Sequence, residues 1–208
     1  MNQPAPQQQT SLPRHPLEPS GDLTQSSDQN AKAESRRYGV RDAAFQAAAQ
    51  GGGENYFSAF ALFLHASPFH IGILSALPQL VGVVAQLLSV KLLQYLRMPA
   101  QLLIGGGWAQ ALCWLPILSL PLLLPEHGPW LLIGCAMLYF AFGHATAPVW
   151  NSLLVDVVET SSRGAYFAQR ARVTALTSFV TLGIAGTVLT LGQKWELSWI
   201  GFLFIFLG

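Results

Sequence analysis

The chain has 208 residues, of which 51% are hydrophobic and only 10% are charged, and its formal net charge is +1. A typical soluble domain carries about 25% charged residues, so the composition excludes an ordinary soluble protein, and the lack of a basic face excludes a nucleic-acid-binding one. Apolar stretches of about 20 residues recur, and a helix needs about that length to cross a bilayer. We therefore predict an all-α, multi-pass transmembrane helix bundle.

The first 38 residues differ from the rest. They are rich in Gln, Pro and Ser and contain almost no apolar residues. Such composition does not form a packed core. We expect residues 1–38 to be a disordered cytoplasmic tail and residues 39–208 to form the transmembrane bundle.

Five complete spans and the start of a sixth are predicted from the apolar runs and the breakers between them. They cover residues 43–65, 71–95, 99–124, 130–155 and 173–191, and the sixth begins near residue 199. The ten residues from there to the end are too few to cross a bilayer. The sequence is therefore expected to be a fragment or a truncated gene product, although a natural short protein is also possible.

Lysine and arginine predict the orientation. If the tail is cytoplasmic, only Lys194 of the span-flanking basic residues lies outside. Those inside are Arg36, Arg37, Arg41, Lys91, Arg97, Arg163, Arg170 and Arg172. Because positive charge accumulates on the cytoplasmic side of membrane proteins, we expect an integral membrane protein with a cytoplasmic N-terminus, in a bacterial cytoplasmic membrane.

The stretch GGGENYFSAFALFL (51–64) places a carboxyl group inside the first predicted span. Thirteen residues separate Arg41 from Glu54, which is about 20 Å of helix. A helix that began after the glycines would be too short to span. We therefore expect the glycines within the helix, allowing close packing or a local kink, and Glu54 near mid-membrane.

Gln50, Glu54 and Ser58 repeat at intervals of four residues, on one helix face. Intramembrane carboxyl groups usually face a cavity or a partner. Glu54 is expected to line a cavity and to exchange a proton. The alternative is a protonated Glu54 that only donates a hydrogen bond between helices.

Polar residues also share one face in two other predicted spans. Gln79 belongs to such a face in the second span, and His144 and Asn151 belong to one in the fourth. His144 lies twelve residues from Asp156 at the inner end, so it matches Glu54 in depth. An acid and an imidazole in one cavity would bind a proton or a cation. The alternative for His144 is a neutral imidazole bonded to a backbone carbonyl.

Several chemistries are not indicated. The sequence has no phosphate-binding loop, no HExxH zinc motif and no GxSxG nucleophile motif. We expect no catalytic residue, no metal site and no cofactor, and the protein is not predicted to be an enzyme.

The topology and the segment LLVDVVETSSRGAYFAQRARV (153–173) resemble the N-terminal half of a major facilitator superfamily transporter. The acidic residues followed by Arg-Gly look like that superfamily's entry into its fifth helix. The stretches GENYFSAFAL and LPQLVGVVAQLLS look like a bacterial branch of it. One departure concerns the loop between spans two and three. Gln94 stands where the family has aspartate, and Arg97 stands about where it has a second glycine.

The resemblance implies alternating access, in which two six-helix bundles rock around a midplane site. It places Glu54 and His144 on the cavity-lining first and fourth helices. It also implies an inner-face charge cluster of Asp156, Arg163 and Arg170, for which the alternative is plain topology charge. The departure in the loop puts the family's inner gating ion pair in doubt.

Two functional hypotheses follow. The first is a transporter, or its N-terminal half, that moves a small-molecule solute, with or without protons, through the lipid bilayer. It would need a C-terminal half or a second copy. The second is a non-transporting membrane protein, either a degenerate half-transporter or a partner-binding subunit. It predicts that the polar stripes pack against each other without a cavity.

Overall fold

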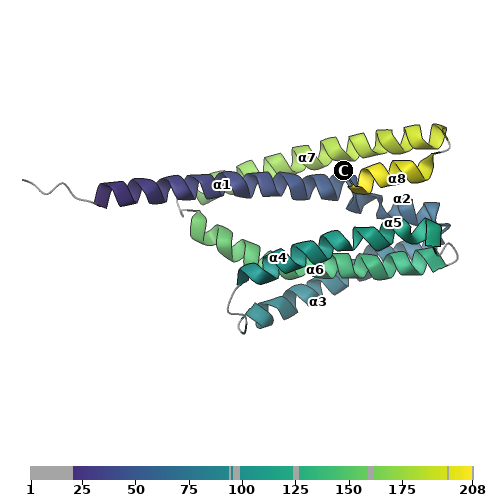
Figure 1. Ribbon diagram of the computed structural model, residues 1–208, viewed down its shortest axis with the longest axis horizontal. Helices are drawn as coiled ribbons and strands as arrows, with labels where there is room; N and C mark the ends of the chain where they lie inside the picture. Colours follow the sequence, from purple (N-terminus) through teal and green to yellow (C-terminus); the bar gives the residue numbers. More distant parts are fainter. Residues whose placement is uncertain are drawn as a thin grey trace, which may run out of the picture.

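Long apolar helices dominate the structure (Figure 1). The computed structural model describes residues 21–93, 95, 99–123, 127–158, 162–195 and 197–207. Over these residues the chain forms helices, among them the 3₁₀ helix η1, and no strand. Their bounds are α1 Gly21–Gly52, η1 Glu54–Tyr56, α2 Phe57–Phe63, α3 Pro68–Leu93, α4 Pro99–Leu112, α5 Trp114–Leu123, α6 Gly128–Val157, α7 Arg163–Lys194 and α8 Ser198–Leu207. The predicted all-α class is confirmed.

Four helical segments in the described residues are long and apolar enough to cross a membrane. They are Pro68–Leu93, Ala100–Leu122, Gly128–Leu153 and Arg163–Lys194. Large apolar side chains on these segments face outward, such as Leu87, which is 65% exposed, and Phe179, which is 76% exposed. Because soluble proteins rarely expose continuous apolar surface of this kind, the four segments indicate a membrane-embedded protein.

The first predicted span, residues 43–65, is not one of these four segments. Its helix is interrupted: α1 ends at Gly52, η1 covers Glu54–Tyr56, and α2 continues from Phe57. The expectation that all three glycines lie within one helix is therefore wrong for Gly53. Glycine costs about 1 kcal/mol relative to alanine inside a helix, so three in a row weaken α1 where packing against α5 redirects the chain.

The glycines permit close approach at two points. A Cβ on Gly53 would lie 2.9 Å from the Trp114 ring of α5. A Cβ on Gly51 would collide with Thr181 and with the backbone of Ser178 on α7. The sequence left open whether the glycines serve packing or a kink, and the structure has both.

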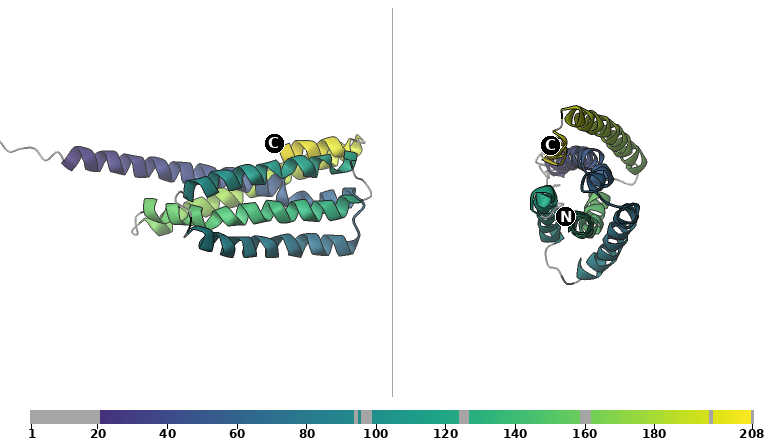
Figure 2. Two further views of the ribbon diagram at one scale, coloured as in Figure 1. Left: turned by 60° about the horizontal axis from the view of Figure 1, so that its bottom comes forward. Right: turned by 90° about the vertical axis from the view of Figure 1, so that its right-hand side faces the viewer.

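The start of α1 also differs from the prediction. Residues 21–38 are helical, whereas the composition predicts a disordered tail over residues 1–38. Residues 1–20 lie outside the described residues. The N-terminal part of α1 extends past the other helices (Figures 1 and 2). It continues the same helix that packs along α7, so helix propagation from a packed segment accounts for order that polar composition alone does not predict.

The most extensive helix pairings are α3 with α6 and α1 with α7, and α4 also packs on α6. Viewed end-on, α7 and α3 lie near opposite edges of the bundle (Figure 2). The end of α6 joins the α3–α6 pair to the α1–α7 pair. Trp150 of α6 and Val158, which follows α6, pack with Tyr166 of α7 and Val40 of α1.

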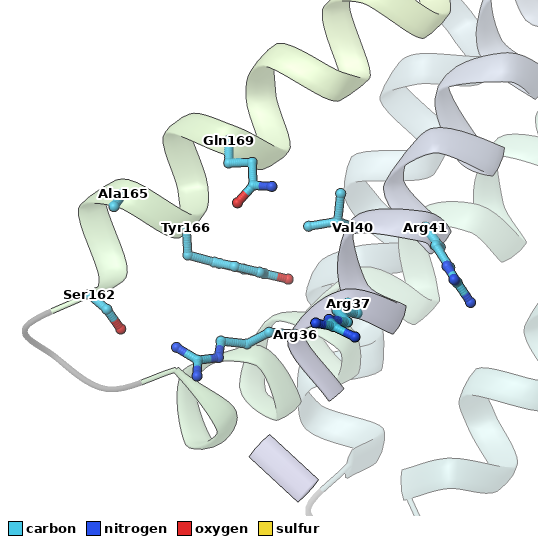
Figure 3. Close-up of a pocket in the computed structure, with 8 residues that line it drawn as sticks. All are labelled: Arg36, Arg37, Val40, Arg41, Ser162, Ala165, Tyr166 and Gln169. Atoms are coloured by element: carbon cyan, nitrogen blue, oxygen red, sulfur yellow. The ribbon is translucent and has the colours of Figure 1, made fainter. Parts of the chain in front are cut away.

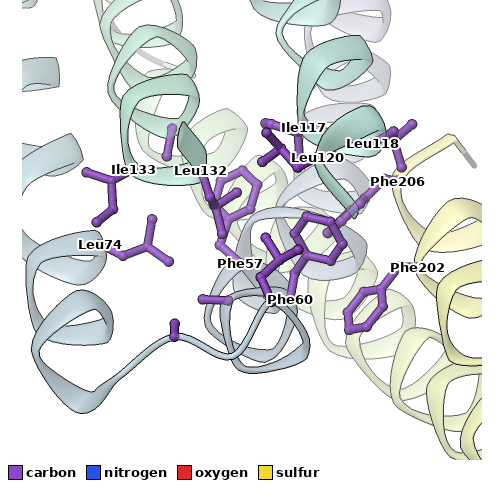
Figure 4. Close-up of a cluster of buried hydrophobic side chains, with 14 of the residues drawn as sticks. Phe57, Phe60, Leu74, Ile117, Leu118, Leu120, Leu132, Ile133, Phe202 and Phe206 are labelled. Atoms are coloured by element: carbon purple, nitrogen blue, oxygen red, sulfur yellow. The ribbon is translucent and has the colours of Figure 1, made fainter. Parts of the chain in front are cut away.

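The largest buried cluster lies where α2, α5, α6 and α8 meet (Figure 4). Phe60 of α2 contacts Phe202 and Phe206 of α8, with ring centroids 5.0 and 5.3 Å apart. Trp114 of α5 stacks near Phe206 at 4.8 Å. Aromatic pairs of this kind add about 0.5–1.5 kcal/mol each beyond burial, so α8 is held to the bundle by its phenylalanines.

Candidate functional site

A polar cavity of about 580 Å³ lies inside the bundle, beside the break in the first helix. Its wall combines amides, hydroxyls, one carboxyl, one imidazole and one guanidinium with small apolar groups. The lining residues are Ala43, Gln46, Ala47, Ala49, Gln50, Glu54, Gln79, Gln110, Tyr139, Phe140, Gly143, His144, Thr146, Arg170 and Thr174. This volume falls within the range of about 300–1,000 Å³ that is common for small-molecule sites.

Glu54 is the first residue of η1, at the point where the helix axis is interrupted. The Tyr139 hydroxyl of α6 donates a hydrogen bond of 2.9 Å to its Oε1. Tyr139 is 3% exposed, and its ring packs edge-on against Phe57. The break therefore places the carboxyl group at the cavity wall, and a rigid aromatic side chain fixes its direction.

His144 lies against α3. A Cβ added to Gly82 would lie 2.9 Å from Cδ2 of His144, so the imidazole occupies the space that any larger residue at position 82 would need. Gln79, one turn before Gly82, lines the same cavity. The close pairing of α3 and α6 thus positions both a histidine and an amide.

The structure brings four of the five predicted cavity residues together: Gln50, Glu54, Gln79 and His144. Asn151 is the exception, since it does not line this cavity and is exposed. Pro148 lies inside α6 between His144 and Asn151, and proline removes a helix hydrogen bond and bends the axis. Past it, Trp150 turns to α1 and α7, which leaves Asn151 on the outer side.

The predicted charge cluster of Asp156, Arg163 and Arg170 stays a prediction, because the side chain of Asp156 lies outside the described residues. Arg170 lines the cavity, and its Nε is buried without a hydrogen-bond partner in the described part of the chain. Arg163 lies two turns earlier on α7, and its Nε donates to the Val158 carbonyl at 3.3 Å. Asp156 belongs to the last turn of α6, and its side chain lies outside the described residues.

Asp42 lies close enough to Arg170 for the two charges to interact. Burial raises the pKa of Asp42 above its ordinary value, and the charge of Arg170 opposes that rise. Gln46, which lines the cavity, donates a hydrogen bond of 3.2 Å to Asp42 Oδ2. Asp42 lies just before the first predicted span and is only half-buried, and its bond to Gln46 places it next to the cavity wall.

Several cavity residues escape the sequence analysis. Tyr139 and Gln110 are the most important, because Tyr139 binds Glu54 and Gln110 interacts with Tyr139. A Cβ on Gly143 would lie 2.6 Å from the Gln110 amide nitrogen, so the Gln110 side chain packs directly against the backbone of α6 at that glycine. Gln46 lies four residues before Gln50, so it extends the stripe of Gln50 and Glu54 by one more turn. The same spacing of four residues could have predicted it from the sequence.

The arrangement suits binding of a polar solute by hydrogen bonds and charge. In the described residues, no group of three or more His, Cys, Asp or Glu side chains is placed to hold a metal ion. Comparison with protein-family models, curated proteins and solved structures gives no match for this chain.

Proposed function

We propose that this chain is part of a transporter of the major facilitator type, which moves a small polar solute across a membrane by alternating access. The observation that carries the proposal is the polar cavity of about 580 Å³ that contains Glu54, His144 and Arg170. Ionisable groups are costly inside a membrane and generally mark solute or ion pathways. A cavity that gathers three of them from three helices has the chemistry of a binding site.

The helix pairings support this proposal. We number α1 with η1 and α2 as span one, α3 as span two, α4 with α5 as span three, and α6, α7 and α8 as spans four to six. The most extensive pairs are then two with four and one with five. An inverted repeat that relates spans one to three to spans four to six converts one pair into the other. The contact of spans three and six, through α5 and α8, maps onto itself.

The break in the first helix supports it as well. Transporters commonly form their sites where a membrane helix is discontinuous, because the freed backbone groups face the cavity. Here the interruption at Gly53 coincides with Glu54 and with the cavity. In this proposal the first span crosses the membrane as two joined pieces, the N-terminus is cytoplasmic, and a second bundle or a second copy completes the transport cycle.

The test begins with ligand identification. Purified protein is screened for thermal stabilisation by amino acids, sugars, nucleosides and small cations. The stabilising solute is then used in exchange assays with proteoliposomes. Glu54→Gln is expected to weaken binding about tenfold or more, since hydrogen bonds to charged groups contribute about 1.5–3 kcal/mol.

The control is Ser119→Ala, because the Ser119 hydroxyl bonds within α5 to the Pro116 carbonyl and lies outside the cavity. It should leave binding unchanged. If Glu54→Gln and Ser119→Ala bind the solute equally well, the cavity is not the site. If exchange by Glu54→Gln keeps the pH dependence of the unsubstituted protein, Glu54 has no role in proton coupling.

One observation favours the alternative of a non-transporting membrane protein. His144 packs directly on Gly82, as expected if the polar stripes serve helix association. That alternative predicts that no solute stabilises the protein and that Glu54→Gln changes only its thermal stability. The same stability screen therefore distinguishes a transporter from a non-transporting membrane protein.

A further inference from the structure

A second, basic pocket lies between α1 and the beginning of α7, separate from the polar cavity (Figure 3). Its volume is about 470 Å³. The proposed transport function does not use it. The lining residues are Arg36, Arg37, Val40 and Arg41 from one side and Ser162, Ala165, Tyr166 and Gln169 from the other.

Three guanidinium groups come from six consecutive residues of α1. Arg37 and Arg41 are four residues apart and so share one helix face, and the Arg41 guanidinium lies 5.9 Å from the Tyr38 ring centroid. Within the described ranges, no carboxylate forms an ion pair with Arg36, Arg37 or Arg41. Like charges along one pocket repel each other, and an anion bound beside them would relieve that repulsion.

The α7 side of the pocket also favours an anion. Ala165, Tyr166 and Gln169 belong to the first two turns of α7, which begins at Arg163. The amino end of a helix carries partial positive charge from its unpaired N–H groups. This 32-residue helix therefore presents its positive end at the pocket that α1 lines with arginine.

Tyr166 supplies an unused hydrogen-bond donor. The residue is 6% exposed, and its hydroxyl has no hydrogen-bond partner in the part of the chain that the structure describes. Figure 3 shows the ring extending from α7 toward the arginines of α1. Buried hydroxyls are nearly always paired, so an acceptor oxygen in this pocket would satisfy Tyr166.

We propose that this pocket binds the phosphate group of an anionic phospholipid headgroup. Arginine matches phosphate oxygens in pairs of parallel hydrogen bonds, and Tyr166 adds a neutral donor. The pocket lies at the end of the bundle that the distribution of basic residues predicts to be cytoplasmic, where anionic headgroups meet protein. A soluble phosphate ion has the same recognition chemistry, so the experiment must separate the two sources.

The experiment uses the full chain purified in a neutral detergent. Phosphatidylglycerol, phosphatidylcholine and inorganic phosphate are titrated in parallel, with thermal stability and native mass spectrometry as readouts. Phosphatidylglycerol is expected to bind about tenfold more tightly than phosphatidylcholine and to raise the unfolding temperature, because occupancy joins α1 to α7. Equal stabilisation by inorganic phosphate at the same concentration would support the anion site and reject the lipid as its source.

The variants separate a defined site from general attraction to basic residues. Arg37→Gln with Arg41→Gln removes two charges from the pocket, and Lys91→Gln with Arg172→Gln removes two exposed charges outside it. The pocket pair is expected to weaken phosphatidylglycerol binding about tenfold or more, and the control pair less than about threefold. Equal losses for both pairs would overturn the proposal.

Tyr166→Phe tests the same site without a change in charge. It keeps the ring that packs with Val40 and Val158 and removes only the hydroxyl, so binding should weaken severalfold while the far-ultraviolet spectrum is retained. If the arginine pair does not fold, Arg36→Gln with Tyr166→Phe provides the decision. If Tyr166→Phe and the double variant Arg36→Gln with Tyr166→Phe both bind phosphatidylglycerol as well as the unsubstituted protein does, the proposal is also overturned.

Discussion

The Tyr139 hydroxyl donates a hydrogen bond of 2.9 Å to Oε1 of Glu54, which ties α6 to the turn that interrupts the first helix. The two residues are 85 positions apart in the sequence, and they meet where η1 begins, directly after Gly53. Around the bond, Tyr139 packs with Phe57 and Trp114. The contact therefore holds a polar group of the cavity in place from an aromatic cluster.

Tyr139→Phe is expected to lower the free energy of unfolding by about 0.5–1.5 kcal/mol, because the half-buried carboxyl group loses its partner while the ring packing is kept. Thermal unfolding in detergent measures the change. A double-mutant cycle with Glu54→Gln isolates the pair, and a coupling energy of about 1 kcal/mol is expected. Fully additive effects would mean that the bond contributes nothing.

Much of the site could be predicted from spacing and depth. Gln50 and Glu54 are four residues apart, and the depth of Glu54 and His144 was counted from charged residues at the helix ends. The first count needs the 3.6 residues per turn of a helix, and the second needs its rise of 1.5 Å per residue. The cavity contains these three residues and Gln79, so helical periodicity was enough to find the polar stripes.

The sequence allows a kink at the glycines, but it does not predict that the helix ends before Gly53 or that Trp114, 61 positions away, packs there. Tyr139 and Gln110 were missed for a related reason. They lie in nearly continuous apolar runs. Such helices have no polar face that would show which side points into the bundle and which side points to lipid. Only the packing of α4 and α6 shows that these side chains face the cavity.

Gly82→Ala is expected to destabilise the protein by about 1–3 kcal/mol, since a Cβ at this position would lie 2.9 Å from the His144 ring. Gly72→Ala on the same helix is the matched control, because a Cβ there meets nothing within 4 Å. The control should be neutral or slightly stabilising. If Gly82→Ala is as well tolerated as Gly72→Ala, the α3–α6 contact is looser than the structure indicates.

The pH dependence of stability should include a contribution from Asp42. Burial raises its folded pKa above the unfolded value, against the opposing charge of Arg170. In the interval between the two pKa values the folded state binds more protons, so stability falls as pH rises through it. Asp42→Asn should remove this part of the slope of unfolding temperature against pH. An unchanged slope would contradict the assignment.

His65→Gly is expected to stabilise the protein. His65 has a φ of 61°, a left-handed conformation that is unfavourable for residues with a Cβ, and its side chain is exposed. The Ala66 N–H bonds to the Ala61 carbonyl at 2.9 Å, and the His65 N–H bonds to the Leu62 carbonyl at 3.0 Å, which is the pattern that ends helices with glycine at this position. Removing the strain should add about 1 kcal/mol to the free energy of unfolding. His65→Ala keeps the Cβ and serves as the control, so a gain by both variants would show that the imidazole, rather than the backbone conformation, was unfavourable.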